Sequence, residues 1–185
     1  MDLDKAIKSR RSVREFKIKK VPWDKVLEAI DAAIQAPAAA NSLPLKFIIV
    51  ESKEKIDKMA ELSGQDWVSD SKIVIAVCSN DSPLESLYNE RGKIYARQQA
   101  GAAIENFLLK ITDLGLSSCW IGSYHEDLMK QLLKVPGHIN IEAILPIGYA
   151  KGKSKEIKKP SLENSINWEE WGSDKKPLKS QEPKW

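Results

Sequence analysis

The chain has 185 residues, of which 42% are hydrophobic, and this length and composition suit one globular domain with a sizeable core. Its 29 Lys+Arg and 26 Asp+Glu residues give a formal net charge of +3, and the two signs are mixed along the sequence. This balance disfavours a protein that binds nucleic acids through a broad basic surface.

Apolar stretches and cysteines exclude further classes of protein. No apolar run approaches the ~20 residues of a membrane-spanning helix, and the N-terminus opens with acidic residues, so we expect neither a membrane anchor nor a secretory signal. Cys78 and Cys119 each lie in an apolar segment without a C-x-x-C partner, which favours buried reduced thiols over a disulfide or a metal site. We therefore expect a cytoplasmic protein.

The first informative stretch follows a short helical opening and reads Ser9-Arg10-Arg11-Ser12-Val13-Arg14-Glu15-Phe16. Guanidinium groups bind phosphate oxygens through a planar set of donors. In an extended segment, Arg10, Ser12 and Arg14 would lie on one side and Arg11 and Val13 on the other. The stretch then predicts a cradle for one phosphate of a small cofactor. A solvated basic turn and a nucleic-acid contact stay open as alternatives.

A helix and a loop of small residues come next. The helix starts at Val21-Pro22, carries an apolar stripe, and ends at Ala36-Pro37, because a residue before proline leaves the helical region. The loop, residues 37–44, sets alanines and Asn41 between two prolines, so a planar ligand or a second chain can approach its backbone closely. The alternative is an ordinary helix-to-strand connection.

The middle of the chain alternates strands and helices. Residues 47–50 and 73–78 are predicted as buried strands, and residues 53–62 as a surface helix between them. Residues 84–114 have a helical pattern, with a break expected at Gly92 and a stop at Gly115. The apolar stripe of residues 100–111 is wider than one core contact requires, which indicates either a central position in the core or a subunit interface.

The last elements are a short strand with a glycine turn at residues 116–124, a helix at 125–134 and a strand at 139–149. Pro146 suits an edge position or the start of that strand. Because the composition changes sharply at residue 150, we divide the chain into a domain of residues 1–150 and a C-terminal tail of residues 151–185. We expect the tail to pack on the body or on a partner subunit, since Trp168 and Trp171 would share one face of a local helix.

Sequence motifs for self-contained catalysis are missing. The chain has no G-x-S-x-G, P-loop or G-x-G-x-x-G motif. His125 and His138 have no partner at metal-ligand spacing, and no credible catalytic triad surrounds them. We predict neither a metal site nor a catalytic side chain, so demanding chemistry would have to come from a cofactor.

Four motifs in order then give a specific resemblance. They are Arg10-Arg11-Ser12-Val13-Arg14-x-Phe16, Ala36-Pro37-Ala38-Ala39-x-Asn41-x-x-Pro44, Gly115-Leu116-Ser117-Ser118-Cys119-Trp120-Ile121-Gly122 and Ile147-Gly148-Tyr149. The chain resembles the nitroreductase family of FMN-dependent flavoproteins over about residues 1–150. The resemblance implies an α+β fold with a mixed, mostly antiparallel central sheet sandwiched by helices. It also implies an intertwined homodimer with an extended C-terminal tail and FMN at the subunit interface.

Three groups of residues are implied to bind FMN. The first would hold the phosphate, the ribityl chain and the pyrimidine side: Arg10, Arg11, Ser12 and Arg14, with Gln65 as a further contact and Lys158 and Lys159 near the phosphate. The second would reach the flavin of the partner subunit: Pro37, Ala38, Ala39 and Asn41. The third would line the ring, with backbone N–H groups near flavin N5 and O4: Trp120, Ile121, Gly122 and Ser123.

The activity that the resemblance implies is that of an FMN-dependent oxidoreductase. NADH or NADPH would deliver hydride to the flavin and leave, and an electron-poor acceptor (nitroaromatic, quinone or similar) would use the same face in a ping-pong mechanism. Leu43-Pro44-Leu45 stands where the family often has Gln-Pro-Trp, so the acceptor is not identified. The alternatives are a specialised flavin reaction such as reductive dehalogenation, a flavin-binding or redox-sensing protein with negligible turnover, and a basic nucleic-acid-binding domain.

Overall fold

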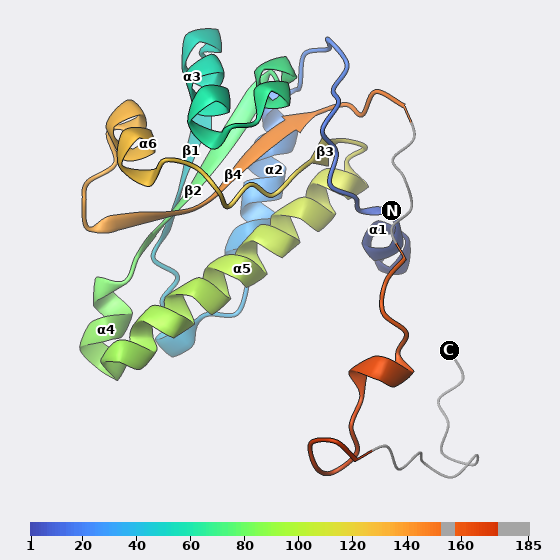
Figure 1. Cartoon of the computed structure of the whole chain (residues 1–185), viewed down its shortest axis with the longest axis vertical. Helices are drawn as coiled ribbons and strands as arrows, with labels where there is room; N and C mark the ends of the chain where they lie inside the picture. Colours follow the sequence, from blue (N-terminus) through green and yellow to red (C-terminus); the bar gives the residue numbers. More distant parts are fainter. Residues whose placement is uncertain (153–157, 174–185) are drawn as a thin grey trace. The chain divides into compact units, whose positions relative to one another are not determined.

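The computed structural model describes residues 1–152 and 158–173, and the chain divides at residue 154 into two units (Figure 1). The elements of the first unit are α1 (Leu3–Ser9), α2 (Trp23–Ile34), β1 (Leu45–Val50), α3 (Lys53–Ser63), β2 (Ile73–Asn80), α4 (Ser82–Tyr88), α5 (Glu90–Asp113), β3 (Ser117–Ser118), α6 (Glu126–Leu133) and β4 (Ile139–Gly148). Short 3₁₀ turns follow α2 at Ala39–Asn41 and α3 at Asp66–Asp70. No helix in the described ranges is long and apolar enough to cross a bilayer.

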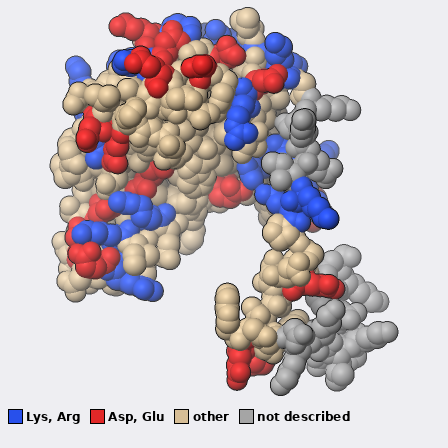
Figure 2. Space-filling model, viewed as in Figure 1, with Lys and Arg blue, Asp and Glu red and all other residues tan. Residues whose placement is uncertain are grey.

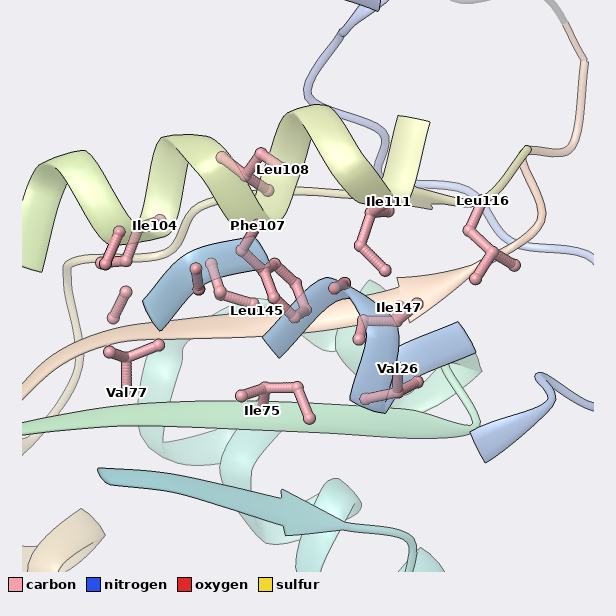
Figure 3. Close-up of a cluster of buried hydrophobic side chains, with 14 of the residues drawn as sticks. Val26, Ile75, Val77, Ile104, Phe107, Leu108, Ile111, Leu116, Leu145 and Ile147 are labelled. Atoms are coloured by element: carbon pink, nitrogen blue, oxygen red, sulfur yellow. The ribbon is translucent and has the colours of Figure 1, made fainter. Parts of the chain in front are cut away.

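The four strands form one sheet in the order β1-β2-β4-β3, and each neighbouring pair is antiparallel. Side chains along β2 point alternately to its two faces. Ile75 and Val77 join the core formed with α2 and α5 (Figure 3), whereas Val74 and Ala76 join the core formed with α3 and α6. The predicted α+β fold, with helices on both faces of a mostly antiparallel sheet, is confirmed.

β1 differs from the predicted buried strand. It is an edge strand of the described sheet, and Val50 is the buried one among its six residues. The apolar run of residues 47–50 predicts burial, but Ile49 is 40% exposed because helices do not cover β1 as fully as they cover β2. The prediction for β2 was correct, since residues 73–79 are all buried.

Pro146 lies inside the sheet, where the sequence pointed to an edge or a strand start. It faces Val74 of β2 on one side. On the other side β3 ends at Ser118, and pairing resumes at Ile121, which exchanges two backbone hydrogen bonds with Ile144. Backbone groups two residues apart in a strand point the same way. The missing N–H of Pro146 therefore falls opposite this interruption, where no ladder hydrogen bond is lost.

The predicted helix of residues 84–114 is broken, but three residues before Gly92. Asn89 separates α4 from α5 with a φ of 52°, and Gly92 lies within α5. A Cβ atom on Gly92 would be 2.2 Å from the backbone oxygen of Leu84. Glycine thus permits the close approach of α4 and α5 and does not end a helix here. The predicted stop at Gly115 is correct, with a φ of 73° just after α5.

The apolar stripe of residues 100–111 lies in the core of its own chain. Phe107 and Ile111 are fully buried in the cluster formed with α2 and the sheet (Figure 3). Of the two possibilities that the sequence left open, the core position is confirmed for these side chains, and a subunit interface along α5 stays a prediction. Exposed apolar surface lies instead on α2, where Trp23, Leu27 and Ile34 are 63%, 43% and 49% exposed.

The described part of the tail, residues 158–173, contains a 3₁₀ turn at Glu163–Ser165 and a loop closed by a 3.0 Å hydrogen bond from the Trp168 N–H to the Ser173 carbonyl. Trp168 and Trp171 therefore lie in a loop and do not share the face of a helix. Packing of the tail on the body or on a partner stays a prediction.

Candidate functional site

The arginine segment, residues 10–16, lies beside β3 and the end of β4. Ser12 and Ser118 form a parallel bridge, and the Val13 N–H donates to the Ser118 carbonyl over 3.0 Å. Phe16 bridges to the segment that follows β4. Val13 and Phe16 are buried, whereas Ser12 and Arg14 are exposed. The bridges therefore hold the segment extended, with its polar side chains turned outward.

Phe16 connects this segment with Gln65. A Cβ atom on Gly148 would be 2.6 Å from the Phe16 ring, so the ring occupies space that a glycine leaves free. The centroids of the Phe16 and Trp67 rings are 6.3 Å apart, and Trp67 Nε1 donates to Gln65 Oε1 over 2.7 Å. Trp67 thus holds Gln65 on the side of the arginine segment. The sequence predicted Gln65 for the site but not Trp67, whose contact with Phe16 joins residues distant in sequence.

The three guanidinium groups have different partners. Arg10 Nε is 3.1 Å from Glu105 Oε1 of α5, so its charge is partly balanced. Arg11 Nη1 donates to the carbonyls of Lys8 and Arg10, at 2.6 and 2.8 Å, where α1 ends and a cation is favoured. Arg14 is exposed, and neither a hydrogen bond nor an ion pair joins it to any part of the chain that the structure describes. Arg14 is thus available to an anion.

A buried hydroxyl and a buried thiol follow in β3 and its turn. Ser118 Oγ is buried and has no hydrogen-bond partner among the described residues. Burial raises the pKa of the Cys119 thiol, and this is opposed by the charge of Arg14 and a hydrogen bond with Ser12. The arginine segment and β3 therefore meet around Ser12 and Ser118. Cys78 and Cys119 are both buried free thiols, as predicted.

Residues 120–123 form the outer part of this turn. Two 3.0 Å backbone hydrogen bonds between Ile121 and Ile144 hold it to β4, so the N–H of Ile121 is occupied. Trp120 is 41% exposed, and its ring lies 3.9 Å from the position of a Cβ atom on Gly101 of α5. The two residues after Ile121 are exposed. The turn therefore packs against α5 through Trp120 and leaves its last residues open.

The small-residue loop, residues 37–41, is held by Gln99 of α5. The Ala39 N–H donates to Gln99 Oε1, and Gln99 Nε2 donates to the Ser42 carbonyl, each over 3.2 Å. Ala40 and Asn41 have φ angles of 51° and 53°, in the left-handed region that residues other than glycine seldom adopt. The small-residue loop is therefore a defined turn, and it lies next to α5.

The small-residue loop and the Trp120 turn lie on opposite flanks of α5. Successive residues of an α-helix are about 100° apart around its axis, so Gln99 and Gly101 are about 200° apart. Glu105, the partner of Arg10, is about 40° from Gly101 and shares its flank. A single chain therefore brings the arginine segment, Gln65 and residues 120–123 to one side of α5. It separates them from the small-residue loop by the width of α5, about 10 Å.

Two cavities in the first unit lie away from these residues. One, of about 300 Å³, is lined by parts of β1 and β2 and by residues 134–136, and another, of about 220 Å³, lies beside residues 18–21. Neither is lined by a residue predicted to bind the cofactor. Lys158 and Lys159 are exposed residues of the second unit, and their place at the site stays a prediction.

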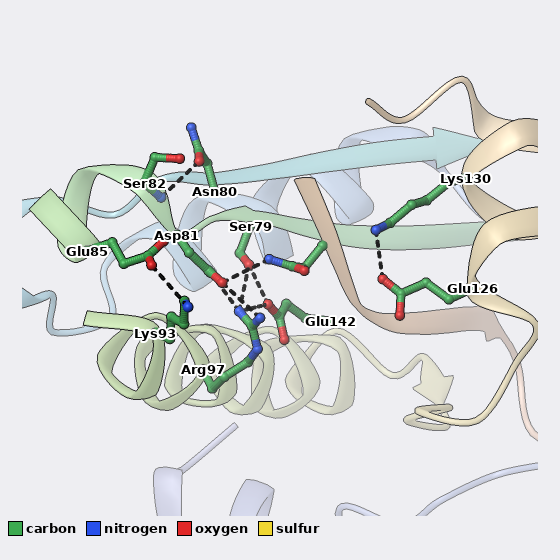
Figure 4. Close-up of polar contacts among 11 residues, drawn as sticks. Ser79, Asn80, Asp81, Ser82, Glu85, Lys93, Arg97, Glu126, Lys130 and Glu142 are labelled. Carbon is green, nitrogen blue, oxygen red and sulfur yellow. Dashed lines mark hydrogen bonds and ion pairs between the residues drawn. The ribbon is translucent and has the colours of Figure 1, made fainter. Parts of the chain in front are cut away.

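A separate group of charges joins α5 to β2 and β4 (Figure 4). Arg97 bonds to both carboxylate oxygens of Asp81, at 2.7 and 2.9 Å, and to Glu142 at 2.7 Å, and Ser79 also bonds to Glu142. Burial acts to lower the pKa of Arg97, but the hydrogen bond to Asp81 and the charge of Glu142 raise it overall. The charges are paired with one another, so this group fastens the fold and does not present a free anion site.

Charges elsewhere are dispersed. Lys and Arg side chains alternate with Asp and Glu over the face of the first unit seen in Figure 2. Within residues 1–152 and 158–173, no group of three or more His, Cys, Asp and Glu side chains is suited to a metal ion.

Several known proteins are similar to this chain. A family model described as "Nitroreductase family" matches residues 7–72 and 60–149. A protein of Methanothermobacter thermautotrophicus, named provisionally as an NADH dehydrogenase/NAD(P)H nitroreductase, is 33% identical over 154 residues, which cover 80% of this chain and 78% of that protein. The FMN reductase (NAD(P)H) of Bacillus subtilis is 25% identical over 182 residues, covering 90% of this chain and 72% of that protein.

Two further matches concern a relative and a solved structure. The iodotyrosine deiodinase of Thermotoga neapolitana is 26% identical over 158 residues, covering 77% of this chain and 85% of that protein. The crystal structure of a nitroreductase family protein from Clostridium novyi NT superposes with a TM-score of 0.76 at 28% identity, covering 94% of this chain and 96% of that one. The family match spans well over half of the sequence, from α1 to the end of β4. This chain belongs to the nitroreductase family.

Proposed function

We propose that this protein is an FMN-dependent oxidoreductase that takes hydride from NADH or NADPH and passes it to an electron-poor small molecule, such as a nitroaromatic or a quinone. Membership of the nitroreductase family supports redox chemistry, and the archaeal and Bacillus relatives bear NAD(P)H nitroreductase and FMN reductase names. Bound FMN would supply the hydride chemistry, and the residues of this chain would bind and orient it.

The observation that carries the proposal is a group of polar side chains where the arginine segment meets β3, two of which have no partner. Arg14 has no partner in the described chain, Ser12 is exposed, and Ser118 Oγ is buried without a hydrogen bond. Guanidinium and hydroxyl donors suit phosphate oxygens and the hydroxyl groups of a ribityl chain. A buried hydroxyl without a partner costs about 1–3 kcal/mol, which a polar ligand would offset. These residues therefore fit FMN, and Ser118 extends the predicted set.

Residues 120–123 would line the flavin ring. The N–H groups of Gly122 and Ser123 make no hydrogen bond with described residues and would be free to donate to N5 and O4. The N–H of Ile121 is already bonded to Ile144, so Ile121 would contribute its side chain. The positive charge of Arg14 would stabilise negative charge that develops on the cofactor.

We further propose that each site is completed by a second subunit. The small-residue loop lies across α5 from the arginine segment, so it would face a cofactor held by another chain. Trp23, Leu27 and Ile34 expose an apolar face on α2, the helix that leads into the small-residue loop. We propose that a two-fold homodimer buries this face and that the loop of one subunit reaches the arginine segment of the other.

Cofactor analysis tests the proposed function directly. The purified protein should release FMN and not FAD, because the arginine segment has donors for one terminal phosphate. Arg14→Ala should remove a charge-assisted hydrogen bond worth about 1.5–3 kcal/mol and weaken FMN affinity about ten- to a hundredfold. Arg11→Ala is the matched control, since Arg11 is engaged by backbone carbonyls, and it should weaken affinity much less. Released FAD, or equal affinity in wild type and Arg14→Ala, would contradict the assignment.

Steady-state kinetics test the order of the two half-reactions. If donor and acceptor use the same face of the cofactor in turn, the kinetics should be ping-pong. Double-reciprocal plots of rate against NADH or NADPH concentration, measured at several fixed quinone concentrations, should then be parallel lines. Intersecting lines would require both substrates to be bound together and would count against a shared face.

Reductive dehalogenation is a second candidate, favoured by the iodotyrosine deiodinase among the relatives. The two candidates differ in the acceptor that sustains turnover. Incubation of the reduced protein with iodotyrosine and with a quinone under anaerobic conditions separates them, because deiodination releases iodide and quinone reduction does not.

A further inference from the structure

Gln99 is an amide in the apolar core-facing half of α5, and its side chain bonds to two residues of one turn. It is 4% exposed, accepts from the Ala39 N–H and donates to the Ser42 carbonyl, each over 3.2 Å. A buried amide is unfavourable unless both its oxygen and its nitrogen are hydrogen-bonded. The turn from Ala39 to Ser42 satisfies both ends of this one side chain.

The turn that Gln99 holds has an unusual backbone. Ala40 and Asn41 both have positive φ angles, and neither is a glycine. Such conformations persist where surrounding contacts fix them. Within the turn, the Asn41 and Ser42 N–H groups donate to the Ala38 and Ala39 carbonyls. The hydrogen bonds that join the turn to other described residues are the two made by Gln99.

Two other side chains tie the same flank of α5 to α2. Asn106 Nδ2 donates to the Ala32 carbonyl over 3.3 Å, and Lys110 pairs with Glu28 at 2.7 Å. These contacts fasten the helix and do not reach the small-residue loop. Gln99 therefore has a role that its neighbours on this flank do not share.

We propose that Gln99 is a positioning residue for the cofactor site, which holds residues 37–41 in the turn that reaches the FMN of the second subunit. This rests on the proposed function. Gln99 itself does not touch the cofactor: its amide is used by Ala39 and Ser42, and it acts by fixing the backbone between them.

Three variants distinguish positioning from a general loss of packing. Gln99→Met keeps the length of the side chain and loses both hydrogen bonds. Gln99→Asn keeps the amide on a side chain one methylene shorter, so it can keep at most one of the two hydrogen bonds, and its defect should be smaller. Asn106→Leu is the control, because it removes a bond between α5 and α2 on the same flank and leaves the small-residue loop untouched.

The readouts are FMN titration of the cofactor-free protein and hydrogen exchange at the Ala39 amide. Gln99→Met should weaken FMN affinity roughly tenfold, as the loss of two hydrogen bonds predicts, and should accelerate Ala39 exchange. Gln99→Asn should fall between Gln99→Met and wild type, and Asn106→Leu should keep wild-type affinity. The conservative Gln99→Asn variant keeps the test decisive if Gln99→Met fails to fold.

Two outcomes would overturn the proposal: wild-type FMN affinity in both Gln99 variants, or an equal loss in Asn106→Leu. Failure of the proposed function looks different, because the wild-type protein would then bind no FMN. In that case, unchanged hydrogen exchange at the Ala39 amide in the Gln99 variants would still refute a positioning role. Faster exchange would show that Gln99 holds the turn of residues 39–42.

Discussion

The apolar face of α2 allows subunit assembly to be separated from folding. Leu27 is 43% exposed on the single chain and lies on the same face as Trp23 and Ile34, whereas Phe107 is fully buried in the core. We predict that Leu27→Asp leaves each subunit folded but breaks the dimer, and that Phe107→Asp prevents folding.

The magnitudes follow from the burial of each side chain. Complete burial of a leucine contributes about 1.5–3 kcal/mol, so the exposed 43% of Leu27 represents about 0.6–1.3 kcal/mol per subunit. A two-fold interface loses this twice, and each new carboxylate also loses hydration worth at least ~1 kcal/mol. The total, about 3 kcal/mol or more, corresponds to roughly a hundredfold or greater rise in the dimer Kd.

Phe107→Asp acts on a different scale. Removal of a buried phenylalanine costs about 3–5 kcal/mol, and burial of an unpaired carboxylate adds several more. The sum is comparable with the whole stability of a typical domain, about 5–15 kcal/mol. This variant should therefore show no cooperative unfolding transition.

Sedimentation velocity, circular dichroism and FMN content together measure these effects. Leu27→Asp should sediment as a folded monomer with little bound FMN. A Leu27→Asp protein that stays dimeric at micromolar concentration would refute the interface on α2. A folded monomer with full FMN occupancy would refute the shared site while leaving the interface in place.

Two further predictions concern stability. Gly92→Ala should cost about 1–3 kcal/mol or more, because its Cβ atom would lie 2.2 Å from the Leu84 carbonyl oxygen. The matched control Gly137→Ala, which meets no atom within 4 Å, should leave the melting temperature nearly unchanged. Burial, with a smaller contribution from Glu142, raises the pKa of Cys78 from about 9 to about 11. The protonated thiol is thus favoured in the folded state. Its contribution to the free energy of unfolding is complete below pH 9, the pKa of the thiol in the unfolded chain, and is lost as the pH rises to 11. In denaturant titrations over that pH range, the free energy of unfolding should fall by about 2–3 kcal/mol more for wild type than for Cys78→Ala. An equal fall in the two proteins would contradict the raised pKa.

The fold was largely predictable because the helices and β2 repeat apolar residues at regular spacing. The errors came from contacts between different elements of the fold. Gly92 indicated a helix break, but its lack of a side chain serves the packing of α4 on α5. Pro146 indicated an edge strand. In the structure it lies opposite the interruption between Ser118 and Ile121, so the N–H that proline lacks would have no hydrogen-bond partner in the sheet there. Local pattern does not contain either contact.

The candidate site was predictable in part for a similar reason. Motifs identified the arginine segment, the small-residue loop and the turn after β3, and the structure shows how the first and last of these meet. Gln99 and Ser118 were not predicted, because a glutamine in a helix and a serine in a strand carry no local signal. Their importance follows from the turn that Gln99 holds and from the hydrogen bond that Ser118 lacks.

The central claim, that two subunits build each cofactor site, is tested most directly with mixed dimers. Arg14→Ala impairs the arginine segment, and Ala38→Glu would place bulk and negative charge in the small-residue loop. In a mixed dimer, isolated with two affinity tags after coexpression, a shared site predicts one site with both defects and one with none. Wild-type FMN affinity should then return at half of the sites. If each site lies within one chain, every site keeps one defect, and the mixed dimer will bind FMN no better than its two parents.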